Sequence, residues 1–288
     1  MEERLEAIRQ IGQYRDLRNP LTDWLHGIFR LATGDSNQAS NLLRDVIVLN
    51  DRQNPYLIQD FTDAEQQARF LTSTQQQGRV WVIYEDGIGP SFKEWRTDLF
   101  LNIGTQFPLH IGLALPEFVP GQPAYHSLTL SADAQTYTTS PLLNLDQLVA
   151  TEFGTGYDAL VVRAVTAAVI KASLQIASDI PQDEDTGESI LLSFMQLLTR
   201  LFSITTTSAD VRSWKALPHT VSIARLPRPQ NGQLSIITQS QENHSVTLPG
   251  SSNADVLLLV KAVTQNSPIV YYVTSFPELV EQGLPYAY

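Results

Sequence analysis

The segment 205–229 concentrates side chains that could form a polar site. Asp210 and Arg212 are a carboxylate and a guanidinium two residues apart, which a turn could pair but a helix would not bring face to face. Trp214 adds a large ring with a single N–H donor, and Arg225 lies in the strand-like alternation that follows. Two interpretations stay open: a connector anchored by Trp214, or a polar surface site framed by it.

Trp214 is expected to be mostly buried, where a helical region meets a β-domain. The hydroxyl-rich run before it ends a helix, and Pro218 just after it forces an extended backbone. A ring of this size offers more apolar area to such a junction than its neighbours do. Truncation to alanine would then cost about 3–5 kcal/mol.

A second group of carboxylates follows the apolar run 79–85. Glu85 and Asp86 lie at its end, and Glu94 and Asp98 come soon after. Paired acids can act as general acid and base, so the loops 85–98 and 210–212 could hydrolyse a cell-wall sugar or peptide if they shared a cleft. The other interpretation of these carboxylates is exposed turn residues.

Other patterns that indicate catalysis or ligand binding are missing from the sequence. GxSxG, GxGxxG, HExxH and a phosphate-binding loop do not occur, and the five histidines are scattered. We therefore predict no catalytic residue, no cofactor-binding residue and no metal ligand. The candidates for an interaction or structural site are Glu85, Asp86, Asp210, Arg212, Trp214 and Arg225.

Composition narrows the class of protein further. The 288 residues are 43% apolar and 17% charged, which is typical of a globular chain long enough for two domains. A net charge of −11 disfavours a nucleic-acid partner, because such partners need a basic surface. The chain has no cysteine, which excludes thiol catalysis and thiolate metal sites. Its charged start does not read as a signal peptide.

Residues 1–77 are predicted to be helical, in segments near 3–15, 21–32, 37–49 and 61–77. Within them, the spacing of Gly27, Gly34, Asp35, Ala39 and Leu43 resembles one tetratricopeptide repeat, in which a small residue lets two helices approach and Gly-Asp makes the turn. Arg30 stands where that repeat usually has an aromatic residue.

Residues 78–288 are predicted to form a β-domain interrupted by a helical hairpin at 157–203. Gly154 and Gly156 are taken to separate a short helix from the first arm of the hairpin. The first arm is apolar nearly all round, as expected of a helix packed on several sides, and the second arm is also apolar. The fold class is therefore α+β, with tetratricopeptide-like helices and then an antiparallel β-domain that packs the hairpin.

With these elements in view, nearly the whole chain resembles an uncharacterised family of bacterial envelope lipoproteins. The resemblance rests on the order and spacing of several short motifs: Asn19-Pro20, the repeat from Gly27 to Ala39, Val82–Gly87 with Pro90, Arg163–Val165 with Lys171, Ala209–Trp214, Leu217-Pro218 and Ala224–Pro227. Family members usually start with a lipoprotein signal and a lipidated cysteine, which this sequence lacks. It looks like the C-terminal part of a longer precursor, or a member without a leader.

The resemblance implies a non-enzymatic component that binds or scaffolds other proteins of the cell envelope. Its place would be the periplasm or the periplasmic face of the outer membrane, with membrane attachment only through a lipid anchor absent from this chain. Other envelope proteins are the expected partners, with a homo-oligomer through the apolar hairpin as a further alternative. The family has no activity that transfers to residues of this chain.

Overall fold

The structure is a computed structural model that describes residues 6, 10–11, 18–50, 53–70, 77–101, 109–179 and 216–276. The chain divides into two compact units. The first comprises Met1–Gly12, Ser91–Val119 and Ala150–Trp214, and the second comprises Gln13–Pro90, Pro120–Val149 and Lys215–Tyr288. The predicted boundary at residue 77 does not coincide with this division, because the helices before it and the sheet after it share one hydrophobic core.

A five-stranded sheet forms the centre of the second unit, in the order β11-β10-β1-β7-β6. The strands are β1 (Arg79–Asp86), β6 (Ser140–Asn144), β7 (Thr220–Pro227), β10 (Val256–Ala262) and β11 (Val270–Ser275). β1 pairs with β10 in parallel, whereas the other described strand pairs are antiparallel. The α+β class is therefore confirmed, with one parallel pair inside a sheet predicted to be antiparallel.

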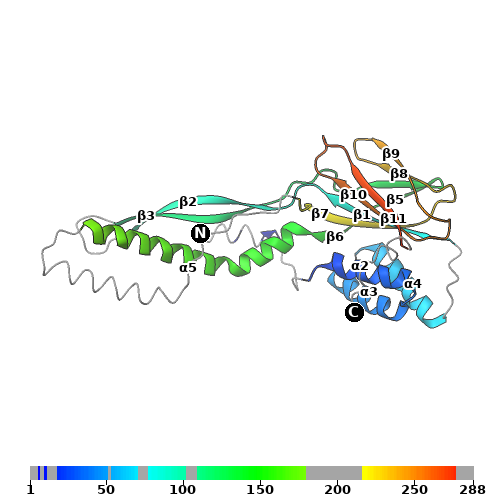
Figure 1. Cartoon of the computed structure of the whole chain (residues 1–288), viewed down its shortest axis with the longest axis horizontal. Helices are drawn as coiled ribbons and strands as arrows, with labels where there is room; N and C mark the ends of the chain where they lie inside the picture. Colours follow the sequence, from blue (N-terminus) through cyan, green and yellow to red (C-terminus); the bar gives the residue numbers. More distant parts are fainter. Residues whose placement is uncertain are drawn as a thin grey trace. The chain divides into compact units, whose positions relative to one another are not determined.

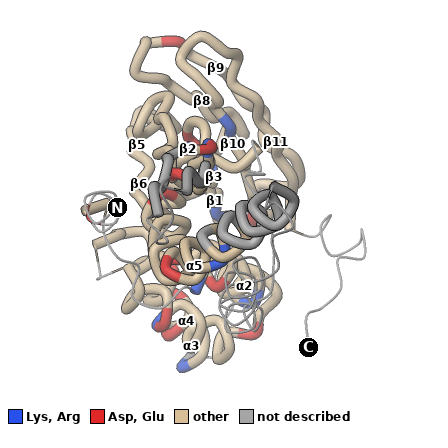
Figure 2. Tube along the Cα trace, turned by 90° about the vertical axis from the view of Figure 1, so that its left-hand side faces the viewer, with Lys and Arg blue, Asp and Glu red and all other residues tan. Residues whose placement is uncertain are grey.

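A four-stranded sheet with the order β5-β4-β8-β9 belongs to the same unit. It contains β4 (Thr129–Ala132), β5 (Gln135–Thr138), β8 (Gln233–Ile237) and β9 (Asn243–Thr247). Consecutive residues of β1 point to opposite faces of the sheet, and nearly all of them are buried. Both faces of β1 are therefore covered. Figure 2 shows the helices formed by residues 20–70 below the central strands and β8 and β9 above them, and residues of all three layers join one core.

Three helices, α2 (Pro20–Ala32), α3 (Ser36–Leu49) and α4 (Pro55–Phe70), complete the second unit (Figure 1). Asn19 caps α2 ahead of Pro20, and Asp35 caps α3 by accepting from the Gln38 N–H. Gly34 adopts a φ of +88° in the turn between them, as a Gly-Asp turn requires. A Cβ on Gly27 would lie 2.8 Å from Leu43, so α2 and α3 approach closely at this residue.

The first unit contains the hairpin of β2 (Ser91–Leu101) and β3 (Leu109–Val119), together with most of the 35-residue helix α5 (Leu145–Asp179). Phe92 of β2 and Phe118 of β3 both contact Phe153 of α5, with ring centroids 4.9 and 6.5 Å away. Tyr157 extends this group one turn further along the helix, 5.3 Å from Phe153. These rings hold α5 against the hairpin.

Several predicted boundaries are wrong. The predicted break at 154–156 does not occur, since α5 runs through both glycines while the Phe153–Tyr157 contact spans them. The segment 85–98 is not one loop, because β2 begins at Ser91. The charged side chains of β2 obscure the strand pattern in its sequence. α4 begins at Pro55 rather than at Phe61, since Asn54 caps it there through the Tyr56 N–H.

Candidate functional site

A buried carboxylate joins the helices to the central sheet. Asp60 of α4 is 0% exposed and accepts hydrogen bonds from two tryptophan indoles, Trp24 at 3.0 Å and Trp81 at 2.9 Å. Each indole uses a different oxygen of Asp60. Nε of Arg225 lies 3.3 Å from the oxygen that Trp81 also contacts. We name these four residues, Trp24, Asp60, Trp81 and Arg225, the Asp60 cluster.

Local structure explains why these side chains meet. Asp60 follows Leu57 by three residues and precedes Ala64 by four, and both neighbours are buried, so Asp60 shares the apolar face of α4. Trp81 and Arg225 are register partners on the adjacent strands β1 and β7, so their side chains project from the same face of the sheet. Trp24 reaches the same point from the buried face of α2.

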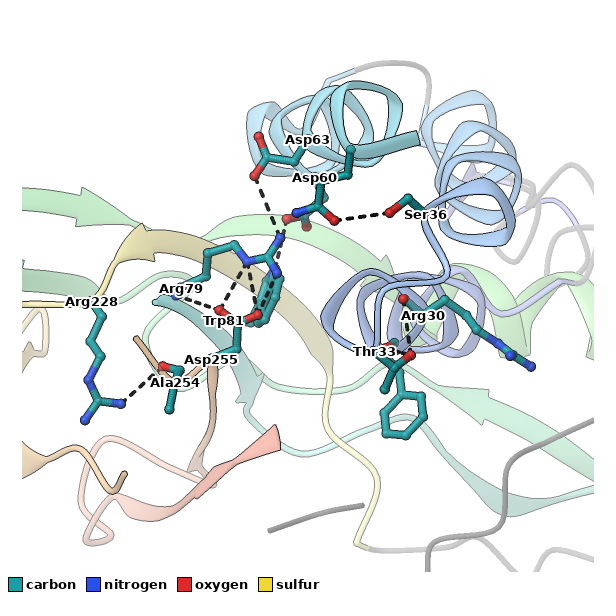
Figure 3. A network of polar contacts seen from close by, with 12 residues as sticks. Arg30, Thr33, Ser36, Asp60, Asp63, Arg79, Trp81, Arg228, Ala254 and Asp255 are labelled. Atoms are coloured by element: carbon teal, nitrogen blue, oxygen red, sulfur yellow. Dashed lines mark hydrogen bonds and ion pairs between the residues drawn. The ribbon is translucent and has the colours of Figure 1, made fainter. Parts of the chain in front are cut away.

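A second guanidinium lies beside the Asp60 cluster, as Figure 3 shows. Arg79 binds Asp255 through Nε and a terminal nitrogen at 3.2 and 2.6 Å, and its guanidinium stacks 4.6 Å from the Trp81 ring centroid. Its other terminal nitrogen lies 3.9 Å from Asp63 of α4, which also pairs with Arg225. Two arginines therefore face two carboxylates of α4 across the layer boundary.

The electrostatics of Asp60 combine two opposing effects. Burial raises the pKa of Asp60 above its ordinary value, because a charged carboxylate loses its hydration in the core. Arg225, Trp81 and Trp24 act in the other direction by stabilising the charged form. Both oxygens of the Asp60 carboxylate accept hydrogen bonds, and the side chain is shielded from solvent. This arrangement suits a structural contact between α4 and the sheet rather than a site that exchanges protons with a substrate.

Glu85 and Asp86 at the end of β1 are also engaged in structural contacts. Glu85 is half-buried and pairs with Lys261 of β10 at 2.9 Å. Asp86 is 0% exposed, and one of its oxygens accepts from the Tyr84 hydroxyl at 2.6 Å and from the Ala124 and Tyr125 N–H groups. Burial raises the pKa of Tyr84, and its hydrogen bond to Asp86 adds to this shift. Asp86 therefore fastens the loop after β3 to the end of β1.

The six predicted candidates thus separate in the structure. Arg225 belongs to the Asp60 cluster, while Glu85 and Asp86 lie four and five positions beyond its partner Trp81 along β1. Asp210, Arg212 and Trp214 lie outside the described residues, as does the second arm of the predicted hairpin. Sequence reasoning missed Trp24, Asp60 and Trp81. The one available signal was a charged residue, Asp60, on the apolar stripe of a helix.

A different kind of surface lies at the edge of the central sheet. β11 is an edge strand, and no strand among the described residues pairs with its outer side. Three consecutive residues on it are exposed: Val270 at 66%, Tyr271 at 42% and Tyr272 at 57%. Edge strands are usually protected by charges, proline or a bulge, and β11 itself carries neither charge nor proline (Figure 2).

The opposite edge of the central sheet, β6, is closed, and the β9 edge of the four-stranded sheet is polar. On β6, Nδ2 of Asn54 donates to the Ser140 and Pro141 carbonyls at 3.2 and 3.0 Å, and Asn50 reaches the Pro141 carbonyl at 3.4 Å. These side chains occupy acceptors that a further strand would need. β9 has a polar, exposed Ser245 at its middle. β11 is therefore the candidate binding surface, and we call Val270, Tyr271 and Tyr272 its exposed edge.

Comparison with protein-family models, with curated proteins and with solved structures found no match. Within the described ranges, no helix is both long enough and apolar enough to cross a membrane. In the same part of the chain, no three His, Cys, Asp or Glu side chains gather as metal ligands would.

Proposed function

We propose that this chain is a non-enzymatic protein-binding or scaffolding component of the bacterial cell envelope. The observation that supports binding is the exposed edge of β11, where an extended segment of a partner could add a strand to the sheet. In this mode main-chain hydrogen bonds supply affinity, and the side chains at the edge supply selectivity. Aromatic residues are enriched at protein interfaces, so the two exposed tyrosines fit such a role.

The envelope location and the repeat-like character of α2 and α3 belong to the same proposal. The location rests on the resemblance to envelope lipoproteins, with other envelope proteins as partners. The close approach at Gly27 and the positive φ of Gly34 support a tetratricopeptide-like pair. Such a pair has stacking faces that one repeat cannot bury alone, which would offer partners a helical surface as well.

The role of Glu85 and Asp86 in this proposal is structural. A general acid or base must reach the proton that it transfers. Asp86 is fully buried, and Glu85 is held by Lys261. Both groups instead fasten β1 to its neighbours, which keeps the central sheet, and with it β11, in one shape.

Photo-crosslinking in the native host tests this function. A photoreactive phenylalanine analogue replaces Tyr271, and the matched control carries it at Ser245 on the polar edge of β9. We expect discrete adducts with envelope proteins, identified by mass spectrometry, from position 271 and not from position 245. Equal yields at the two positions, or no adduct at either, would contradict binding at the exposed edge.

A further inference from the structure

We propose that the exposed edge of β11 binds the same edge of a second copy of this chain in antiparallel orientation. This inference rests on the proposed function and names one partner for the exposed edge of β11. Such a pair would join the two five-stranded sheets into one continuous sheet across a two-fold axis. An isologous contact of this kind uses the same residues on both copies.

Charge favours this occupant. The chain has a net charge of −11, so two copies repel one another overall. Residues 262–277 contain no charged side chain, and β11 lies inside this stretch. The nearest charged residue of the paired strand, Lys261, is neutralised by Glu85 of its own sheet at 2.9 Å. Two copies can therefore meet here without burying or opposing a charge.

The order of side chains on β11 is self-complementary. An antiparallel pair centred on Tyr271 would place Val270 of each copy opposite Tyr272 of the other. Aromatic and β-branched residues form favourable cross-strand pairs. All three side chains are exposed in one chain, so their burial would remove apolar surface from water.

The edges of the sheet also determine where such an assembly would stop. The opposite edge, β6, is closed by Asn50 and Asn54 through the Ser140 and Pro141 carbonyls. A sheet with one open edge can add one partner through it. The expected product is a closed dimer rather than a fibre.

The absence of cysteine from the chain permits a direct test. Tyr271→Cys places one thiol at the two-fold axis, where directly opposed residues of antiparallel strands lie about 4.5–5.5 Å apart between Cα atoms. A disulfide spans that distance. Under mild oxidation of the purified chain, we expect a reducible dimer at twice 32.1 kDa from Tyr271→Cys. The matched control Ser245→Cys should remain a monomer. Equal crosslinking of the two variants would overturn the proposal.

Charge swaps test the register without a crosslink. Val270→Lys/Tyr272→Lys places like charges opposite each other, and we expect sedimentation to show loss of the dimer. Val270→Lys/Tyr272→Glu places the new lysine of each copy opposite the new glutamate of the other, and we expect the dimer to persist. Thermal unfolding of each variant checks that the fold is retained, which exposed positions should allow. Identical behaviour of the two folded variants would overturn this pairing.

The two proposals fail in different ways. A purified wild-type chain that sediments at 32.1 kDa at every concentration overturns the second copy as partner. If position 271 then still forms adducts with other proteins in the native host, the protein-binding function stands with a different occupant. If position 271 forms no adduct and the chain stays monomeric, both proposals are wrong.

Discussion

At the scale of single residues, the Asp60 cluster shows how a carboxylate is kept in a hydrophobic core. Two indole N–H groups and a guanidinium replace the water that Asp60 loses, and each comes from a different element of the second unit. A buried charge stripped of one partner is costly, because the remaining contacts cannot replace its hydration. The cluster therefore makes the position of α2 and α4 on the sheet sensitive to individual side chains.

Trp24→Phe tests the donor from α2. The substitution keeps an aromatic ring in the core but removes the N–H that Asp60 accepts at 3.0 Å. We expect a loss of about 1–3 kcal/mol in the free energy of unfolding, the usual cost of an unsatisfied buried acceptor. Urea denaturation measures it. In a double-mutant cycle with Asp60→Asn, the two effects should not add, and strict additivity would show that the hydrogen bond contributes nothing.

The raised pKa of Asp60 predicts a pH dependence of stability. Between the ordinary value of 3.8 and the raised folded value, the folded state binds more protons than the unfolded state. The stabilising contribution is therefore complete below 3.8 and is lost as pH rises through the folded pKa. We expect the stability of the wild type relative to Asp60→Asn to fall across that window, measured by denaturation at a series of pH values. A relative stability that rises with pH would contradict the direction of the shift.

At the scale of elements, α5 shows that packing overrides local helix breakers. Gly154 and Gly156 predict a break, but a glycine inside a helix costs only about 1 kcal/mol. The ring contacts of Phe153 and Tyr157 on either side offset that cost. One long helix results where the sequence suggested two.

Gly156→Ala should therefore stabilise the chain. A Cβ at this position meets no atom within 4 Å, and the backbone is helical. We expect a gain of about 0.5–1 kcal/mol, because alanine loses less backbone freedom than glycine on folding. Thermal unfolding provides the measurement. As a control, Gly87→Ala places a Cβ 2.1 Å from the Gln122 carbonyl oxygen at a φ of +74° and should destabilise.

Asn54 links two elements at once, and its loss should affect both. Its oxygen caps α4 through the Tyr56 N–H at 3.0 Å, and its amide nitrogen donates to two carbonyls of β6. Asn54→Ala removes all three contacts at a fully buried position, so we expect a loss of about 1–3 kcal/mol in unfolding free energy. Asn50→Ala should cost less, because its contacts with β6 are longer, at 3.4 and 3.5 Å. Equal losses in the two variants would argue against this role for Asn54.

At the scale of the whole molecule, charge sets the conditions under which two copies can meet. Repulsion between chains of charge −11 acts over the Debye length, which falls from about 30 Å at 0.01 M salt to about 8 Å at 0.15 M. The proposed contact is uncharged, so salt should screen the repulsion and leave the contact intact. We expect the dimer to tighten as salt rises over this range, measured by sedimentation. A dimer that weakens as salt rises would indicate ion pairs in the interface. The control is Val270→Ser/Tyr272→Ser, which should not associate.

The sequence by itself determined the class of fold and the position of most strands in the second unit. β1, β7, β8, β10 and β11 each lie on a run of the sequence that alternates or is rich in β-branched residues. These signals are local, because the side-chain period of a strand is visible in five or six consecutive residues. The turn at Gly34 and the caps near α2 and α3 are local for the same reason.

Only the tertiary structure decided which residues meet. Trp24 lies 36 positions from Asp60, and Arg79 lies 176 positions from Asp255. The parallel pairing of β1 with β10, on which the edge position of β11 depends, joins strands equally far apart. No local pattern encodes a strand's neighbour, since register and partner follow from burying every apolar face at once. For this reason the sequence named Arg225 only as a candidate for an interaction or structural site, and the structure makes it a partner of the buried Asp60.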